Sequence, residues 1–221
     1  MIRNQETLDQ TLAAIARFVK RRLIPAEEQV DRDGVIPRDI VEDLAQLGLA
    51  GLGLPEEYGG LGMTVEEKMR VVMACGHAAP TFYRRLSTND GLGFALVHAG
   101  TAPQKSAWLP RLASGQVTGS FALTEPAGGS DLAALQTTAR KEGDTYVLNG
   151  TKRFITNAPY ADVFLVLART DPANKGARGI SAFLVEADAP GLHRAKADAK
   201  MGLHGNDTAD VIFDNCRIPA A

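Results

Sequence analysis

The stretch Phe121-Ala-Leu-Thr-Glu-Pro-Ala-Gly-Gly-Ser-Asp131 lies where the sequence changes its character. Ahead of it, apolar residues recur at intervals of three and four, which is typical of amphipathic helices. From about Val117 onward they alternate, which is typical of strands. We therefore expect an α+β chain, with an all-α domain over residues 1–117 and a small antiparallel β-barrel or sandwich domain over residues 118–221.

The composition of this stretch favours an irregular loop. Pro126 fixes its own φ, and the paired glycines after it reach backbone angles closed to other residues. Thr124 and Ser130 add hydroxyl groups. The residues alone leave two interpretations open. The loop either holds the polar edge of a flat ligand with its backbone N–H groups, or is a plain surface turn that Ser130 or Asp131 closes as a helix cap.

Helices are expected throughout the first domain. The first spans residues 7–23, with Thr7 and Gln10 as a capping box and Pro25 beyond its end. Thr64 and Glu67 predict a second capping box. Further helices are expected over residues 37–47, around residues 92–97 and from residue 101 to about residue 113. In this domain we also expect core positions for three large apolar side chains, those of Met69, Met73 and Phe82.

Short strands are expected throughout the second domain. Residues 136–141 and 145–149 read as a hairpin that turns at Gly143-Asp144. The apolar run at 162–170 fits a strand that is buried on both faces. The remaining strands are expected at residues 119–123, 151–156, 180–186 and 210–214.

Composition excludes several classes of protein. The chain has 221 residues and a formal charge of -2, with 24 basic and 26 acidic residues, so it lacks the basic excess of a nucleic-acid-binding protein. No run of about 18 apolar residues predicts a membrane span. Two distant cysteines indicate no disulfide framework and fit a reducing cytoplasm, and the four scattered histidines indicate no metal site.

Four stretches, in order along the chain, resemble the acyl-CoA dehydrogenase family. The loop itself is similar to the family's flavin-binding signature, Thr-Glu-Pro-x-x-Gly-Ser-Asp. The other similar stretches are residues 52–62, residues 148–157, and residues 200–207 together with 213–219. The resemblance spans nearly the whole chain, although family members continue beyond its last motif into a C-terminal helical bundle.

The resemblance implies FAD as the cofactor and an acyl-CoA as the substrate. The flavin contacts it implies are Phe121, Leu123, Thr124, Gly129, Ser130, Phe154, Ile155 and Thr156. The substrate contacts it implies are Ser130, Asn89 and Leu92. Many family members carry Trp where this chain has Phe154, so stacking is kept and an indole N–H is lost.

The implied reaction is FAD-dependent α,β-dehydrogenation of an acyl-CoA thioester. It needs a carboxylate base in a dry pocket, and the family's base belongs to the bundle, so no catalytic residue is assigned to this chain. We expect a fragment or truncated form that binds flavin weakly and is inactive alone. The full-length enzyme is expected to be a homo-oligomer whose electron acceptor is an electron-transfer flavoprotein. An acyl-CoA oxidase, or a non-catalytic flavin- or acyl-CoA-binding subunit, are the alternatives.

Overall fold

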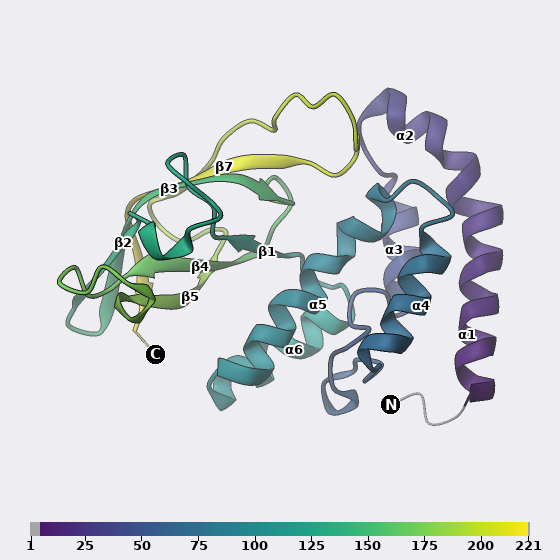
Figure 1. Cartoon of the computed structure of the whole chain (residues 1–221), viewed down its shortest axis with the longest axis horizontal. Helices are drawn as coiled ribbons and strands as arrows, with labels where there is room; N and C mark the ends of the chain where they lie inside the picture. Colours follow the sequence, from purple (N-terminus) through teal and green to yellow (C-terminus); the bar gives the residue numbers. More distant parts are fainter. Residues whose placement is uncertain (1–4, 221) are drawn as a thin grey trace. The chain divides into compact units, whose positions relative to one another are not determined.

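The structure, a computed structural model, describes residues 5–220, and these form two compact units (Figure 1). The helical unit comprises the residues up to Thr118 together with Lys200–Asn206. The β unit comprises Gly119–Ala199 together with the residues from Asp207 onward. Each unit has its own apolar core, as expected for elements that each bury one face.

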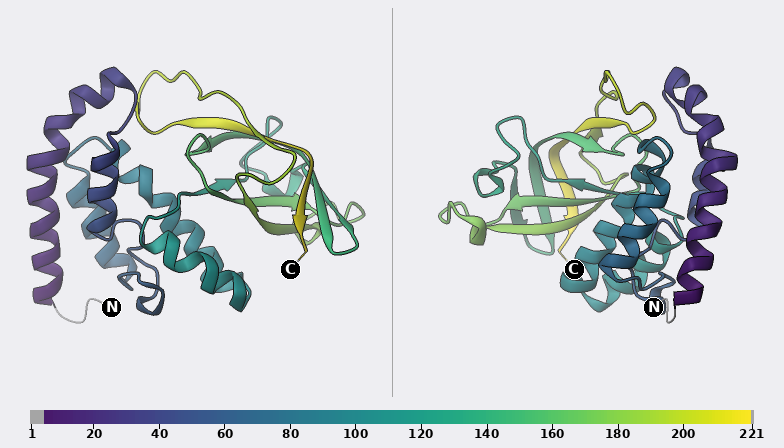
Figure 2. Two further views of the ribbon diagram at one scale, coloured as in Figure 1. Left: turned by 180° about the vertical axis from the view of Figure 1, so that it is seen from behind. Right: turned by 45° about the vertical axis from the view of Figure 1, so that its right-hand side comes forward.

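The first helix of the helical unit is longer than expected. Helix α1 (Gln5–Phe18) continues through a π-helical turn (Val19–Leu23) and a 3₁₀ turn (Ile24–Ala26) into α2 (Glu27–Asp33), with a bend that both views of Figure 2 show. The predicted stop at Pro25 is therefore wrong, because a proline in the first turn of a new helical segment needs no hydrogen-bond donor. The predicted cap at Thr7 is also wrong, since Thr7 lies inside α1.

The other helices begin with better local signals. They are α3 (Arg38–Gln46), α4 (Val65–Cys75), α5 (Thr81–Ala99) and α6 (Ala102–Ala113), and a 3₁₀ turn spans Glu56–Tyr58. The capping box of Thr64 and Glu67 is confirmed, with both of its hydrogen bonds present.

Helix α4 buries a different face from the one expected. Phe82 lies in the core as predicted, with 1% of its surface exposed. Met69 and Met73 are 47% and 73% exposed, so their predicted core positions are wrong. The face of α4 that carries Val71 and Cys75 packs inward, and the two methionines, one helical turn apart, share another face.

The β unit is one curled, mixed sheet. Its strands are β1 (Gly119–Ala122), β2 (Thr138–Glu142), β3 (Thr145–Thr156), β4 (Val163–Arg169), β5 (Ile180–Glu186), β6 (Leu192–Arg194) and β7 (Thr208–Pro219). The order is β1-β4-β2-β3-β7-β6, with β5 paired to β4. The expected fold class is confirmed, with one refinement: β1 runs parallel to β4, because a long crossover joins them, while the hairpin of β2 and β3 is antiparallel.

Strand β3 is continuous where two strands were expected. Asn149 and Gly150 make a register shift against β7 and no turn, and Gly150 has φ of +149°. The burial of β4 alternates between buried and half-buried residues, so the prediction of full burial on both faces is wrong for Leu165 and Leu167.

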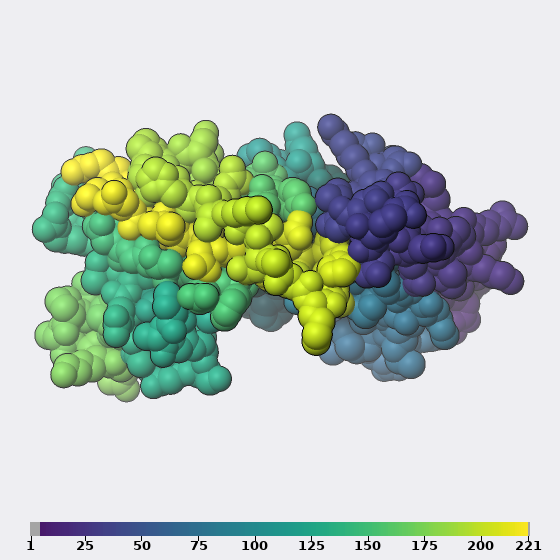
Figure 3. Space-filling view, turned by 90° about the horizontal axis from the view of Figure 1, so that it is seen from above, coloured from purple at the N-terminus to yellow at the C-terminus, as the bar shows by residue number. Residues whose placement is uncertain are grey.

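A short segment from the C-terminal part of the chain belongs to the helical unit. In this segment, Lys200–Asn206, the carbonyl of His204 accepts a hydrogen bond of 2.8 Å from the Thr81 hydroxyl. The His204 Nδ1 lies 2.8 Å from the Asp31 carboxylate and 2.9 Å from the Asp31 carbonyl, and its Nε2 lies 3.1 Å from the Lys200 carbonyl. The space-filling view shows the segment against α2 (Figure 3). Both ring nitrogens therefore face oxygen acceptors, an arrangement that suits a doubly protonated imidazole.

Candidate functional site

The loop after β1 and the end of β3 meet in the β unit. The backbone N–H of Arg153 donates to the carbonyl of Thr124 at 2.8 Å. Behind this contact, the Ser120 hydroxyl donates to the carbonyl of Thr156 at 2.6 Å. Two stretches about thirty residues apart in sequence, each predicted to contact one flat ligand, thus lie side by side.

A β-bulge turns Phe154 toward solvent at this junction. The register between β3 and β7 shifts between Lys152 and Ile155, and Phe154 has φ of +57°. Left-handed backbone at a bulky aromatic residue is strained, and such strain concentrates at functional sites. The Phe154 ring is 57% exposed, with the Arg153 guanidinium 4.9 Å from its centroid. It offers a flat apolar face beside the loop.

The polar groups around this ring suit the rim of a flavin. Among residues 5–220, no partner accepts from the backbone N–H groups of Thr124, Gly129 and Ser130. The side-chain hydroxyls of Thr124, Ser130 and Thr156 likewise have no hydrogen-bond partner in the described chain. A Cβ on Gly129 would lie 3.0 Å from Thr124 Cγ2, so a larger residue would crowd the loop. The donor set and the exposed ring therefore fit the cofactor that the sequence predicts.

The remaining predicted flavin residues lie on the same two strands. Phe121 and Leu123 are half-buried at the end of β1 and the start of the loop. Ile155 is 2% exposed and pairs with Ala209 of β7, so its side chain belongs to the core. Whether each of these residues touches a flavin stays a prediction.

Sequence reasoning missed Lys152, which lies at the base of the site. Its side chain is 0% exposed, and its Nζ donates to Glu125 Oε1 at 2.8 Å and to the Leu123 carbonyl at 3.1 Å. The Glu125 carboxylate also accepts from the backbone N–H groups of Gln136 and Thr137, at 2.6 and 2.9 Å. Glu125 is thus loop structure, as expected, while no local pattern of residues indicates Lys152 as its partner.

Burial and hydrogen bonding act against each other on the pKa of each member of this pair. Burial alone would raise the pKa of Glu125, but the hydrogen bonds from Lys152 and from residues 136 and 137 outweigh it and hold the pKa below its ordinary value. Burial lowers the pKa of Lys152, and Glu125 offsets part of that change. Three of the roughly four acceptor positions of this buried carboxylate are thus occupied within the chain.

A second cation, the half-buried Arg169, binds the C-terminal part of the loop. Its guanidinium donates to the carbonyls of Ala133 at 2.6 Å, Leu135 at 3.3 Å and Asn174 at 2.6 Å. Asp131 caps the intervening 3₁₀ turn (Leu132–Ala134) by accepting from the Ala133 N–H at 3.1 Å, which is the capping role expected for it.

The two predicted substrate residues of α5 lie inside the helical unit. Asn89 is 0% exposed, and its Nδ2 donates to the carbonyls of Leu112 at 3.0 Å and Val117 at 2.7 Å. Leu92 is also fully buried. Their contact with a substrate stays a prediction. The two hydrogen bonds of Asn89 join α5 to the end of α6 and to the chain that follows it, which is a structural role.

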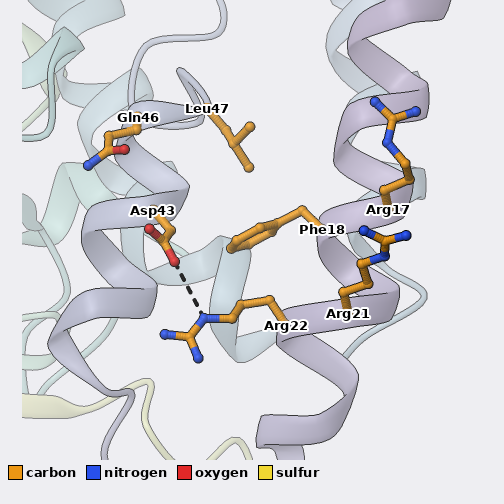
Figure 4. A pocket seen from close by; sticks show the side chains of 7 residues that line it. All are labelled: Arg17, Phe18, Arg21, Arg22, Asp43, Gln46 and Leu47. Carbon is orange, nitrogen blue, oxygen red and sulfur yellow. Dashed lines mark hydrogen bonds and ion pairs between the residues drawn. The ribbon is translucent and has the colours of Figure 1, made fainter.

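A separate hollow of about 580 Å³ opens in the helical unit between α1 and α3 (Figure 4). Phe18 and Leu47 point into it, and Arg22 Nε donates to Asp43 Oδ2 at 3.4 Å on one side. Its lining contains none of the predicted flavin or substrate residues: Arg17, Phe18, Arg21, Arg22, Asp43, Gln46 and Leu47.

Residues 5–220 hold neither a candidate metal site nor a candidate membrane span. These residues contain no group of three or more His, Cys, Asp or Glu side chains that could hold a metal ion. None of the helices within the same range is long and apolar enough to cross a bilayer.

Family models match nearly all of the described chain. The model for the N-terminal domain of acyl-CoA dehydrogenase matches residues 5–116, and the model for its middle domain matches residues 120–216. The chain belongs to the acyl-CoA dehydrogenase family. The resemblance carried by the four stretches is thereby confirmed.

The proteins similar to this chain are longer than it is. Acryloyl-CoA reductase (NADH) of Anaerotignum propionicum is 41% identical, over all of this chain and 56% of its own length. A chain in the structure of an electron transferring flavoprotein of Acidaminococcus fermentans is 36% identical, with a TM-score of 0.92, over all of this chain and 58% of that one. A glutaryl-CoA dehydrogenase of Mycobacterium smegmatis, solved with FADH2, is 34% identical, with a TM-score of 0.89, over 98% of this chain and 54% of that one. This chain thus spans about half the length of the relatives it matches.

Proposed function

We propose that this chain supplies the flavin-binding loops and part of the acyl-CoA site of an FAD-dependent acyl-CoA dehydrogenase. One observation carries the proposal: the hydrogen bond from Arg153 N–H to the Thr124 carbonyl joins the two flavin-type stretches into one surface. The solved family member with FADH2 supports the choice of cofactor.

The residues of this chain bind the flavin and orient the substrate. Phe154 offers a ring face, the hydroxyls of Thr124 and Thr156 reach the polar rim, and the N–H groups of Gly129 and Ser130 stabilise negative charge at that rim. Ser130 also orients the thioester end of the substrate. A bound flavin supplies the acceptor for the hydride that leaves the β carbon of the acyl group.

We assign no catalytic base to this chain. The Glu125 carboxylate is engaged by Lys152 and by two backbone N–H groups, and Asp131 caps a 3₁₀ turn. Both acids thus already take part in hydrogen bonds of the loop, whereas removal of the α proton requires a carboxylate within hydrogen-bond reach of it.

The proposal extends to the electron acceptor, the location and the oligomeric state of the enzyme. An electron-transfer flavoprotein is the proposed acceptor, which the similarity to a chain in the Acidaminococcus fermentans structure supports. The full-length enzyme is proposed to be a cytoplasmic homo-oligomer in acyl-CoA metabolism. The opposite direction, reduction of a 2-enoyl-CoA, is a second candidate, favoured by 41% identity to acryloyl-CoA reductase.

FAD titration of the purified chain tests the proposal. We expect weak, saturable quenching of flavin fluorescence, and weaker binding for Thr156→Val by about two- to tenfold, as for the loss of one hydrogen bond. Thr151→Val, the same change on the same strand, is the matched control and should bind like the wild type. Absence of saturable binding, or equal loss in both variants, would contradict the proposal.

A further inference from the structure

Lys152 is an unusual residue to find inside a small β unit. Its side chain is 0% exposed and its partner carboxylate, Glu125, belongs to a residue that is 7% exposed. Removing a lysine from water is costly, and well-packed apolar residues often serve a core equally well. We therefore expect the Lys152–Glu125 pair to do more than stabilise the core of the sheet.

The contacts of Lys152 converge on the proposed flavin loop. Its ammonium holds the Leu123 carbonyl at 3.1 Å and the Glu125 carboxylate at 2.8 Å, on either side of Thr124. The next residue, Arg153, donates its N–H to the Thr124 carbonyl at 2.8 Å. Three consecutive loop residues are thus fixed by two consecutive residues of β3.

The same carboxylate closes the loop on itself. Glu125 accepts from the N–H groups of Gln136 and Thr137, at 2.6 and 2.9 Å, where the chain enters β2. The ion pair therefore ties the start of the loop, its end and the strand that carries Phe154 to one point.

We propose that Lys152 is a positioning residue of the flavin site, acting through Glu125 and the Leu123 carbonyl to set the distance between the Thr124 hydroxyl and the exposed Phe154 ring. The inference rests on the proposed function. Lys152 touches neither flavin nor substrate; it fixes the backbone that does. A neutral pair of similar size would keep the sheet folded and release the loop.

The test compares the full chain with Glu125→Gln/Lys152→Met, which removes both charges together and so avoids leaving one of them buried alone. Lys141→Met, an exposed lysine on β2, is the control. Hydrogen exchange is measured at the backbone N–H groups of Arg153 and Gln136 without ligand, and FAD is then titrated. We expect at least tenfold faster exchange at both groups, tenfold weaker FAD binding, and a long-wavelength absorption band at saturating FAD that is closer to that of free flavin. The circular dichroism of the sheet should be retained.

Each outcome decides the matter. Exchange within twofold of the wild type in the folded double variant would overturn the inference, and so would unchanged FAD affinity and band shape. Loss of the sheet in the double variant would also overturn it, because the pair would then be needed for folding and not for position. If the wild-type chain binds no FAD, the proposed function fails, while the exchange rates still decide whether Lys152 holds the loop.

Discussion

Replacing Asn89 should destabilise the helical unit strongly. Its Nδ2 is the donor for two buried carbonyls, those of Leu112 and Val117, which lie at the end of α6 and in the chain leaving it. The two lost hydrogen bonds remove about 1 kcal/mol each. The Leu112 carbonyl keeps a hydrogen bond of 3.1 Å from the Gly115 N–H, whereas the Val117 carbonyl is left buried and unpaired, at a cost of about 1–3 kcal/mol. With partial relaxation of the Val117 carbonyl, we expect Asn89→Leu, which keeps the volume, to lower the free energy of unfolding by about 2–4 kcal/mol. Asn89→Ala should lower it further, because it adds a cavity.

Urea denaturation, monitored by the fluorescence of Trp108, reports the unfolding of the region that Asn89 stabilises. Trp108 is the only tryptophan in the sequence, and it lies in α6, the helix whose Leu112 accepts from Asn89. With a slope of about 2 kcal/mol per molar urea, the midpoint should fall by about 1–2 M. Gln10→Ala, on the exposed surface of α1, is the control and should change stability by less than about 0.5 kcal/mol. Asn89→Leu could instead unfold at the same urea concentration as the control and lose acyl-CoA binding. That result would refute the structural role of Asn89 and support its predicted contact with the substrate.

Three further substitutions test other parts of the helical unit. The hydrogen bond to the Lys200 carbonyl, followed by those to Asp31, raises the pKa of His204, so its stabilisation is complete below the unfolded value of about 6.5 and is lost as pH rises through the folded value. Thermal unfolding should therefore show a larger deficit for His204→Gln in acid than in alkali, and a deficit independent of pH would contradict this. Gly93→Ala would place a Cβ 2.6 Å from Leu54 Cδ2. Although alanine favours helices, the melting temperature of this variant should therefore fall by an amount equivalent to about 1–3 kcal/mol. A rise would show that the loop carrying Leu54 moves to make room for the methyl group. Thr64→Ala removes one half of a capping box and should cost about 1 kcal/mol in urea, and no change would mean that water replaces the cap.

The parts of the fold that could be predicted are those with local causes. The capping box of Thr64 and Glu67 needs residues three apart, and the hairpin needs the turn at Gly143, whose φ is +61°. Both are encoded within a few residues, so short stretches of sequence are enough to predict them.

The parts that could not be predicted depend on distant partners. Nothing near Lys152 in sequence reveals that Glu125, twenty-seven residues away, will neutralise it in the core. The bulge at Phe154 arises from pairing with β7, and the parallel pairing of β1 with β4 depends on where the crossover lands. The convergence of the two flavin-type stretches came from the family resemblance, and the Arg153 to Thr124 hydrogen bond gives it a physical basis.

The membership of Lys200–Asn206 in the helical unit affects how that unit can be completed during biosynthesis. Gly205 packs so close to Val30 and Ile36 that a Cβ there would lie 2.9 and 3.0 Å from their side chains. As the ribosome delivers the polypeptide, the helices emerge first, and Lys200–Asn206 arrives only after most of the β unit. Until that segment has left the ribosome, the helical unit lacks the hydrogen bond from the Thr81 hydroxyl to the His204 carbonyl and the packing of Gly205 on Val30 and Ile36.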